Sequence, residues 1–156
     1  MAVRIDFLSD FTPEKTKDAC RKMSLEERGV KYVVEFDPPM DCAAYAVDGH
    51  IIKGTHTDKC DKLVFAQSSD HVLSIFVELK GSDVAHAIKQ LEATITHPLF
   101  SRNKTDKRVA RIVSKKIPSN AGNSVVIKAK NRFRDKYKCE LLCVKSGNPD
   151  RFKDIF

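Results

Sequence analysis

The chain has 156 residues, of which 42% are hydrophobic and 31% are charged. This composition is typical of one globular domain and excludes a largely disordered chain, so we treat residues 1–156 as a single domain. No apolar run approaches the ~20 residues that a membrane-spanning helix needs, and the first residues lack the apolar segment and cleavage site of a secretory signal. We therefore expect a cytoplasmic protein with no membrane partner.

The net charge of +7 is distributed unevenly along the chain. Residues 1–100 carry 12 Lys or Arg and 16 Asp or Glu, a net charge of −4, whereas residues 101–156 carry 16 and 5, a net charge of +11. The asymmetry indicates a basic surface for a polyanion beside an acidic region that could hold a cation. Composition leaves open whether the polyanion is a nucleic acid, an anionic membrane surface, or absent.

The five cysteines are Cys20, Cys42, Cys60, Cys139 and Cys143. Their number is odd, their spacing is scattered and no CxxC motif occurs, which argues against a disulfide framework and a zinc site. We expect reduced thiols that are mostly buried.

The first third of the chain predicts a helix followed by a strand. A threonine and a proline at the start of segment 12–23 favour a helix there, and SLEE at 24–27 resembles a capping box for one extra turn. The β-branched and aromatic residues of 30–36 predict a strand, and the DPP sequence at 37–39 is expected to end it.

The middle of the chain predicts hairpins. The Asp48-Gly49 pair between two apolar runs is a strong hairpin signal. Residues 62–66 (KLVFA) and 72–80 (VLSIFVELK) predict two strands around a polar turn at 67–70. The second run is almost continuously apolar, so we expect a central strand that is covered on both faces.

The remaining segments alternate between helix and strand. Helical spacing of apolar residues predicts a helix over 83–95, with Ser82 as a cap and Pro98 beyond its end. Further elements are expected as a strand over 109–117, a basic helix over 124–137 and a strand over 139–144. This order predicts the α/β class with a mixed sheet flanked by helices.

Two carboxylates and an amine are predicted to meet at the end of the central hairpin. If the turn centres between Ser69 and Asp70, Asp61 lies opposite Glu78, with Cβ atoms ~5 Å apart. Lys80 follows Glu78 by two residues and therefore points to the same face of the sheet. An isolated ExK is often a surface pattern, but here it follows the apolar run VLSIFV and faces an aspartate, which favours a functional site.

The chemistry of this group favours a magnesium ion. Two close carboxylates repel each other unless a cation lies between them, and oxygen ligands in an open site suit Mg²⁺, for which we expect Mn²⁺ to substitute. Asp61, Glu78 and the backbone carbonyl of Leu79 are the candidate ligands. Lys80 could orient a metal-activated water and offset negative charge in a transition state.

These residues resemble the PD-(D/E)xK nuclease superfamily. Asp61, the Glu78-Leu79-Lys80 segment and Gln90 on the following helix carry the resemblance as motif, and the order of elements carries it as topology. The resemblance implies a restriction-endonuclease-like core with the order αβββαβ, metal binding by Asp61 and Glu78, catalysis by Lys80, and Gln90 near the site. It also implies a Mg²⁺-dependent nuclease.

The chain departs from the pattern of this superfamily in two ways. Cys60 stands where many members have proline, and Thr94 stands where the RecB-type enzymes have tyrosine after the glutamine. Many members also add an acid from the first helix. The candidates for that acid are Glu14, Asp18, Glu26 and Glu27, between which the sequence does not choose.

A nucleic-acid enzyme needs positive charge that follows the phosphates. Candidates occur after the motif helix, on the next strand and on the last helix: Arg102, Lys104, Lys107, Arg108, Arg111, Lys115, Lys116, Lys128, Lys130, Arg132, Arg134 and Lys136. The sequence contains no helix-turn-helix or zinc-finger motif, so it does not indicate recognition of a base sequence by a known module.

Two functional hypotheses follow. The first is a metal-dependent endonuclease that acts on DNA in defence, repair or mobile-element processing, with RNA open as an alternative substrate. The second is a catalytically silent nuclease-fold module that binds nucleic acid or a partner protein. A chain of 156 residues leaves little room for target recognition, which a homodimer or a partner subunit would then supply.

Overall fold

The computed structural model describes residues 8–49, 51–52, 60–79, 83–116 and 124–156. In this part of the chain the strands are β1 (Lys15–Glu27), β2 (Val30–Ala46), β3 (Lys62–Ser68), β4 (His71–Leu79), β5 (Lys107–Ser114), β6 (Cys139–Lys145) and β7 (Pro149–Lys153). The helices are α1 (Val84–Thr96), α2 (Pro98–Ser101) and α3 (Ser124–Tyr137).

One mixed sheet contains all of these strands. The strand order is β1-β2-β3-β4-β5-β6, and β7 pairs with β2. Strands β1 to β4 pair as an antiparallel meander, whereas β4, β5 and β6 are parallel to one another. The crossover from β4 to β5 contains α1 and α2, and the crossover from β5 to β6 contains α3. The expected mixed α/β class with a central β4 is confirmed.

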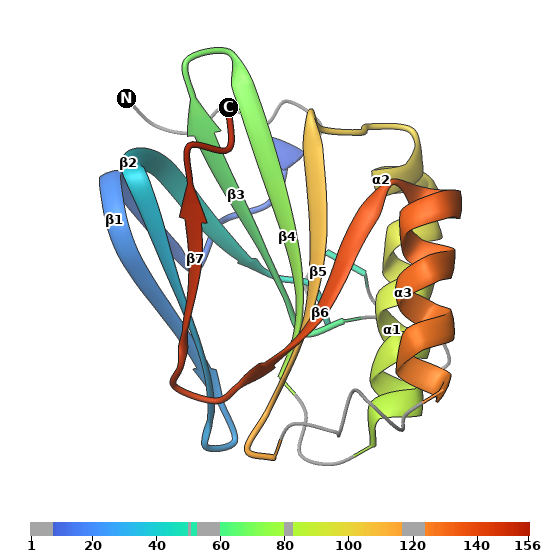
Figure 1. Cartoon of the computed structure of the whole chain (residues 1–156). Helices are drawn as coiled ribbons and strands as arrows, with labels where there is room; N and C mark the ends of the chain where they lie inside the picture. The colour runs from blue at the N-terminus through green and yellow to red at the C-terminus, as the bar shows by residue number, and fades with distance from the viewer. Residues whose placement is uncertain (1–7, 50, 53–59, 80–82, 117–123) are drawn as a thin grey trace.

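The two faces of the sheet bury two separate cores. On one face, α1 and α3 cover strand residues such as Phe65 and Phe76. The helices contribute Leu91 and Phe133 to this first core. On the other face the sheet curls so that β1, β2 and β7 cover the opposite sides of β3, β4 and β5 (Figure 1). The helices α1 and α3 lie side by side on the first face, as two crossovers of the same hand require.

Most predicted elements agree with the structure to within a few residues. Strands β3, β4, β5 and β6 and helix α3 lie where the apolar patterns placed them. Helix α1 starts one residue later than expected because Asp83 is its N-cap, accepting a hydrogen bond from the His86 backbone N–H. Strand β7 was not predicted, because its polar sequence, PDRFK, lacks the apolar alternation typical of a strand.

The helix predicted over 12–23 is wrong, and so is the extra turn at 24–27, because strand β1 occupies this segment. The side chains of Cys20, Met23 and Leu25 all point into the second core. An odd spacing such as that of Cys20 and Met23 would place them on opposite faces of a regular strand. The pairing with β2 shifts register between Cys20 and Lys22, and this bulge brings them to one face.

The break predicted at 37–39 is also wrong, because β2 continues through both prolines. Proline lacks the N–H that a sheet ladder needs. The pairing of β1 passes from Glu35 to Met40, so the prolines fall where β1 makes no regular ladder contact. Strand β7 pairs beside β2 as far as Asp37, and β3 begins to pair from Asp41 onward.

The Asp48-Gly49 signal marks a real turn, although only part of the predicted hairpin falls within the described residues. The Gly49 N–H donates to the Ile52 carbonyl, and the Ile52 N–H donates to the Val47 carbonyl, both at 3.0 Å. Gly49 has a φ of 76°, which glycine adopts without strain. Residue 50 and residues 53–59 lie outside the described part of the chain.

A buried ion pair attaches β7 to the rest of the sheet. The Arg111 side chain is 2% exposed, and its Nε donates to Asp150 at 2.7 Å. Its remaining nitrogens donate to the Ala110 carbonyl and to the carbonyl and carboxylate of Glu140. Burial and the charge of Asp150 raise the pKa of Tyr32, whose hydroxyl donates to the same carboxylate. A fully partnered guanidinium at this position makes the docking of β7 specific.

We expect Asp150→Ala to destabilise the fold by about 3 kcal/mol, because it leaves the buried Arg111 charge without its closest partner. The matched control is Arg151→Ala on the same strand, which breaks an exposed pair with Glu35 and should cost less than about 1 kcal/mol. Urea unfolding of both variants measures the difference. Equal losses in the two variants would contradict a central role for the Arg111 pair.

Candidate metal and acid site

The structure places Asp61 and Glu78 opposite each other at the end of the β3–β4 hairpin. Pairing between these strands runs from Ser68 opposite His71 to Lys62 opposite Val77. The next pair in this register is Asp61 and Glu78, as the position of the turn predicted. By the alternation of side chains along a strand, both residues belong to the face that α1 covers, together with Leu63 and Phe76.

The two carboxylates are held by reciprocal hydrogen bonds across the hairpin. The Asp61 backbone N–H donates to Oε1 of Glu78 at 3.1 Å, and the Leu79 backbone N–H donates to Oδ2 of Asp61 at 2.9 Å. The Asp61 carbonyl also accepts from the Val47 N–H at 3.0 Å, which joins the site to the end of β2. Asp61 is therefore fixed through its N–H, its carbonyl and its carboxylate.

The electrostatics of the pair differ from those of a surface ion cluster. Glu78 has 0% of its surface exposed, and Asp61 is partly buried. A buried carboxylate is stabilised by hydrogen bonds or by positive charge, and a second carboxylate nearby raises the need for that charge. Lys80, the expected source of one positive charge, lies outside the described residues.

Helix α1 contacts this end of the hairpin through Thr94. The Cys60 N–H donates to the Thr94 hydroxyl at 2.8 Å, and that hydroxyl donates to the Gln90 carbonyl at 2.9 Å. Gln90 is one turn from Thr94 on the same side of the helix and is partly buried. Burial raises the pKa of the Cys60 thiol, so this cysteine stays protonated and fills core volume.

The acids of the N-terminal segment do not join the pair. Glu14 bonds to Lys62 at 2.7 Å, and Lys62 alternates to the other face of β3 from Asp61. Asp18, Glu26 and Glu27 lie on β1, which covers the face of the sheet opposite to the one that Asp61 and Glu78 follow. The expectation of an acid from a first helix is not met, because that helix is a strand.

The donor set of the pair fits a magnesium ion held by few protein ligands. Asp61 and Glu78 present hard carboxylate oxygens on one face, and Mg²⁺ characteristically binds through one or two carboxylates while keeping water and phosphate ligands. The Leu79 carbonyl remains the third candidate ligand from the sequence. Among the described residues, no group of three or more His, Cys, Asp or Glu is arranged to hold a metal.

The candidate basic residues divide into exposed and buried groups. Eight of the candidates are exposed: Arg102, Lys104, Lys107, Lys115, Lys116, Lys128, Arg134 and Lys136. Arg108 is 7% exposed and Arg111 is 2% exposed, so both are buried, and their binding to nucleic acid stays a prediction. The alternation of β5 turns Arg111 into the second core, where Asp150 binds it.

Two further residues of α3 have structural partners. Arg132 donates to Glu92 of α1 at 2.7 Å, and the Tyr137 hydroxyl donates to the same carboxylate at 2.7 Å. Burial raises the pKa of Glu92, but the bonds from Arg132 and Tyr137 outweigh burial and hold that pKa below its ordinary value. These contacts join α3 to α1, while Lys130 remains partly exposed beside them.

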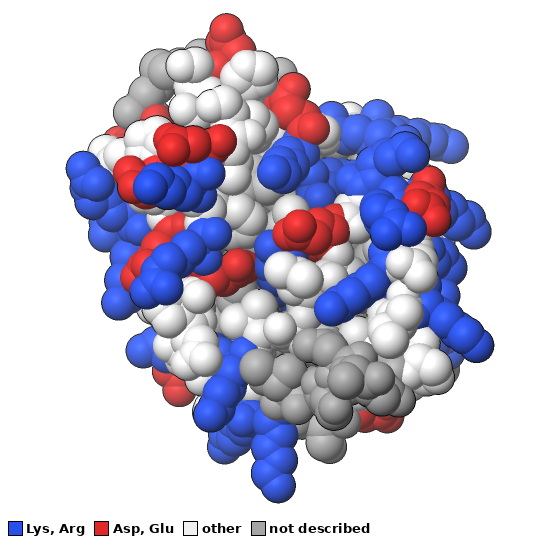
Figure 2. Space-filling view, in the orientation of Figure 1, with Lys and Arg blue, Asp and Glu red and all other residues white. Residues whose placement is uncertain are grey.

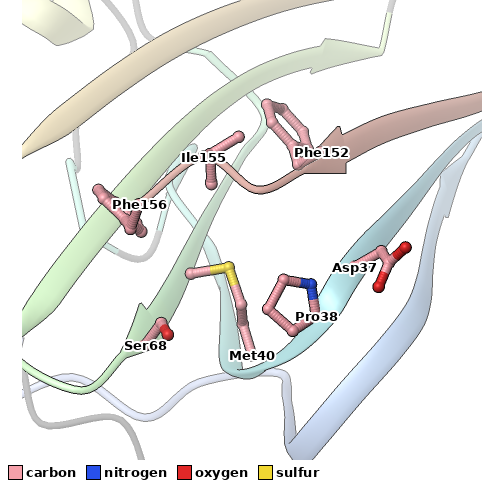
Figure 3. Close-up of a pocket in the computed structure, with 7 residues that line it drawn as sticks. All are labelled: Asp37, Pro38, Met40, Ser68, Phe152, Ile155 and Phe156. Atoms are coloured by element: carbon pink, nitrogen blue, oxygen red, sulfur yellow. The ribbon is translucent and has the colours of Figure 1, made fainter.

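Two hollows that are lined entirely by described residues include neither Asp61 nor Glu78 in their linings. A small pocket of about 20 Å³, partly open to solvent, lies where the Met40 side chain of β2 points toward Ile155 and Phe156 at the C-terminal end (Figure 3). Its lining is mostly apolar, and it packs the C-terminal residues against β2 and β3. A larger groove of about 450 Å³ follows the edge of β6 and is lined by basic side chains of β5 and α3. Lys138 lines this groove and was not among the sequence candidates.

Comparisons with protein-family models, with curated proteins and with solved structures find no match to the chain. Among the described residues, no helix is both long and apolar enough to cross a membrane. Any functional assignment therefore rests on the site itself.

We expect Thr94→Val to destabilise the fold by about 1–3 kcal/mol, because it leaves the buried Cys60 N–H without an acceptor. Thr96→Val is the matched control, since Thr96 bonds back to its own helix in the same way but is exposed, and it should change stability by less than about 0.5 kcal/mol. Thermal unfolding separates the two. A neutral Thr94→Val would show that α1 does not position residue 60.

Proposed function

We propose that the chain is a metal-dependent endonuclease of the PD-(D/E)xK type that hydrolyses phosphodiester bonds in DNA. The observation that carries this proposal is the reciprocal hydrogen bonding of Asp61 and Glu78 at the carboxyl end of β4. Ligand sites of α/β sheets lie beyond the carboxyl ends of parallel strands, and β4 is the first of three such strands here.

The proposed roles follow from the positions of the side chains. Asp61 and Glu78 would hold Mg²⁺ through the oxygens that face away from their backbone bonds, and the bound ion supplies Lewis acidity and a more acidic water. Preorganisation helps this role, because three hydrogen bonds already fix Asp61 before any ligand binds. Lys80, two residues beyond Glu78, would offset the charge that develops on the phosphate oxygens. Gln90 would support the site from α1.

A second candidate function is a silent module that binds nucleic acid without cutting it. The absence of a three-ligand metal group among the described residues favours this alternative, as does the replacement of the expected first helix by β1. The two candidates differ in one measurable property, which is metal-dependent turnover.

For the nuclease, we expect purified protein with Mg²⁺ or Mn²⁺ to cut plasmid or single-stranded DNA, with EDTA abolishing the cutting. Asp61→Asn and Lys80→Ala should each reduce the rate at least about 100-fold, as loss of one charge-stabilising group does in other enzymes. Asp70→Asn at the opposite end of the same hairpin is the control and should cut normally, since Asp70 is exposed. Gels with an RNA lane measure all three. A folded wild type that cuts nothing would support the silent module.

For the metal, we expect Mg²⁺ or Mn²⁺ to raise the melting temperature of the wild type, because an ion that binds only the folded state stabilises it. Asp61→Asn should lose this increase while keeping the hydrogen bond from the Leu79 N–H through its amide oxygen. Differential scanning fluorimetry over a metal titration measures both. An equal shift in the two proteins would place the ion elsewhere.

A further inference from the structure

The groove along the free edge of β6 has the composition of an anion site. Among the described residues, β6 pairs only with β5, so its other edge carries no partner strand. Five cationic side chains line this β6-edge groove: Lys107, Arg108, Lys130, Arg134 and Lys138. Figure 2 shows Lys and Arg side chains gathered over the part of the molecule that contains α3 and β6, at the right of the view.

Arg108 distinguishes this groove from a merely solvated basic surface. The residue is 7% exposed, and one end of its guanidinium donates to the Tyr137 carbonyl. Its other terminal nitrogen, Nη1, is buried and has no hydrogen-bond partner among the described residues. A buried donor without an acceptor costs free energy, which an anion entering the groove would recover.

The acidic residues near the groove do not neutralise it. Glu140 is the one acid in the lining, and its Oε1 accepts from Arg111 at 3.0 Å. Arg134 pairs with Asp135, but both side chains are about two-thirds exposed, and such pairs contribute little and exchange readily. The groove therefore keeps an excess of positive charge for a ligand.

The groove extends toward the row of the sheet that contains Glu78. In the sheet register, Glu78 lies beside Ile112, and Ile112 lies beside Cys143 of β6. The groove lining reaches Leu142, which directly precedes Cys143 on β6. Two strand spacings of ~4.8 Å separate β4 from β6. A nucleic-acid strand that follows the groove from Lys138 to Leu142 thus runs toward the row of the acid pair.

We propose that the β6-edge groove binds the phosphate backbone of a single nucleic-acid strand. Successive cations along one edge match a row of phosphates, and the outward N–H groups of an edge strand are additional donors. The partly exposed Leu142 offers an apolar contact for a base. A single strand fits better than a duplex because the site follows one edge. The choice of nucleic acid rests on the proposed function, whereas the anion site rests on the groove.

The test compares two variants of equal charge. The groove variant combines Lys107→Gln, Lys130→Gln and Lys138→Gln, and the control variant combines Lys17→Gln, Lys22→Gln and Lys153→Gln on β1 and β7. Fluorescence anisotropy of a labelled 12-nucleotide oligothymidine in EDTA measures binding without cleavage. We expect about tenfold weaker binding by the groove variant and a salt slope lower by about 2, at ~0.7 per lost phosphate contact on a single strand. The control variant should bind like the wild type.

Several outcomes would overturn the inference. The first is a dissociation constant of the groove variant within twofold of that of the wild type, and the second is an equal loss of affinity in both variants. The third is no binding of the oligonucleotide by the wild type. The fourth is displacement of the oligonucleotide by a poly-glutamate peptide at a concentration of negative charge lower than that of the oligonucleotide. Parallel cleavage assays separate this inference from the proposed function. Binding that depends on the groove lysines, without metal-dependent cutting, would contradict only the proposed nuclease. Metal-dependent cutting, with binding that does not depend on those lysines, would contradict only the proposed groove. Asp61→Asn should bind like the wild type.

Discussion

The register of the β3–β4 hairpin is the constraint on which the rest of the molecule depends. Because side chains alternate between faces, a slip by one residue would exchange the two cores and move Glu78 to the face opposite α1. The observed register places Phe65 and Phe76 under the helices and Val64 and Ile75 under the curled strands. The same register brings Asp61 opposite Glu78, so core packing and the candidate site are set by one pairing.

The sheet buries charge on both of its faces and handles it differently on each. On the curled side, Arg111 is surrounded by Asp150, Glu140 and backbone carbonyls, an arrangement that satisfies its donors and holds β7 in place. On the helix side, Glu78 lies beside a second carboxylate at the end of a strand. A buried cation that is paired with carboxylates, as Arg111 is, needs no further partner. Two carboxylates that backbone hydrogen bonds hold close together suit a cation between them.

The basic residues of the C-terminal half of the chain occupy two kinds of position. Part of its charge is structural, since Arg132 joins α3 to α1 and Arg111 anchors β7. Another part lines the β6 edge, where a strand without a neighbour would otherwise be open to pairing with other chains. Lysines along that edge discourage such pairing and at the same time create the field that a polyanion needs.

The sequence by itself determined the elements whose signals are local. The apolar run of β4, the helical spacing of α1, the amphipathic α3 and the position of the turn at Ser69 were sufficient to predict these elements and the meeting of Asp61 with Glu78. Tertiary structure alone decided the rest. A bulge and pairing with β2 made β1 a strand against its helical signals, and a buried partner drew the polar β7 into the sheet. The sequence alone did not show that Arg108 and Arg111 are buried, because α3 covers the first and the curl of the sheet covers the second.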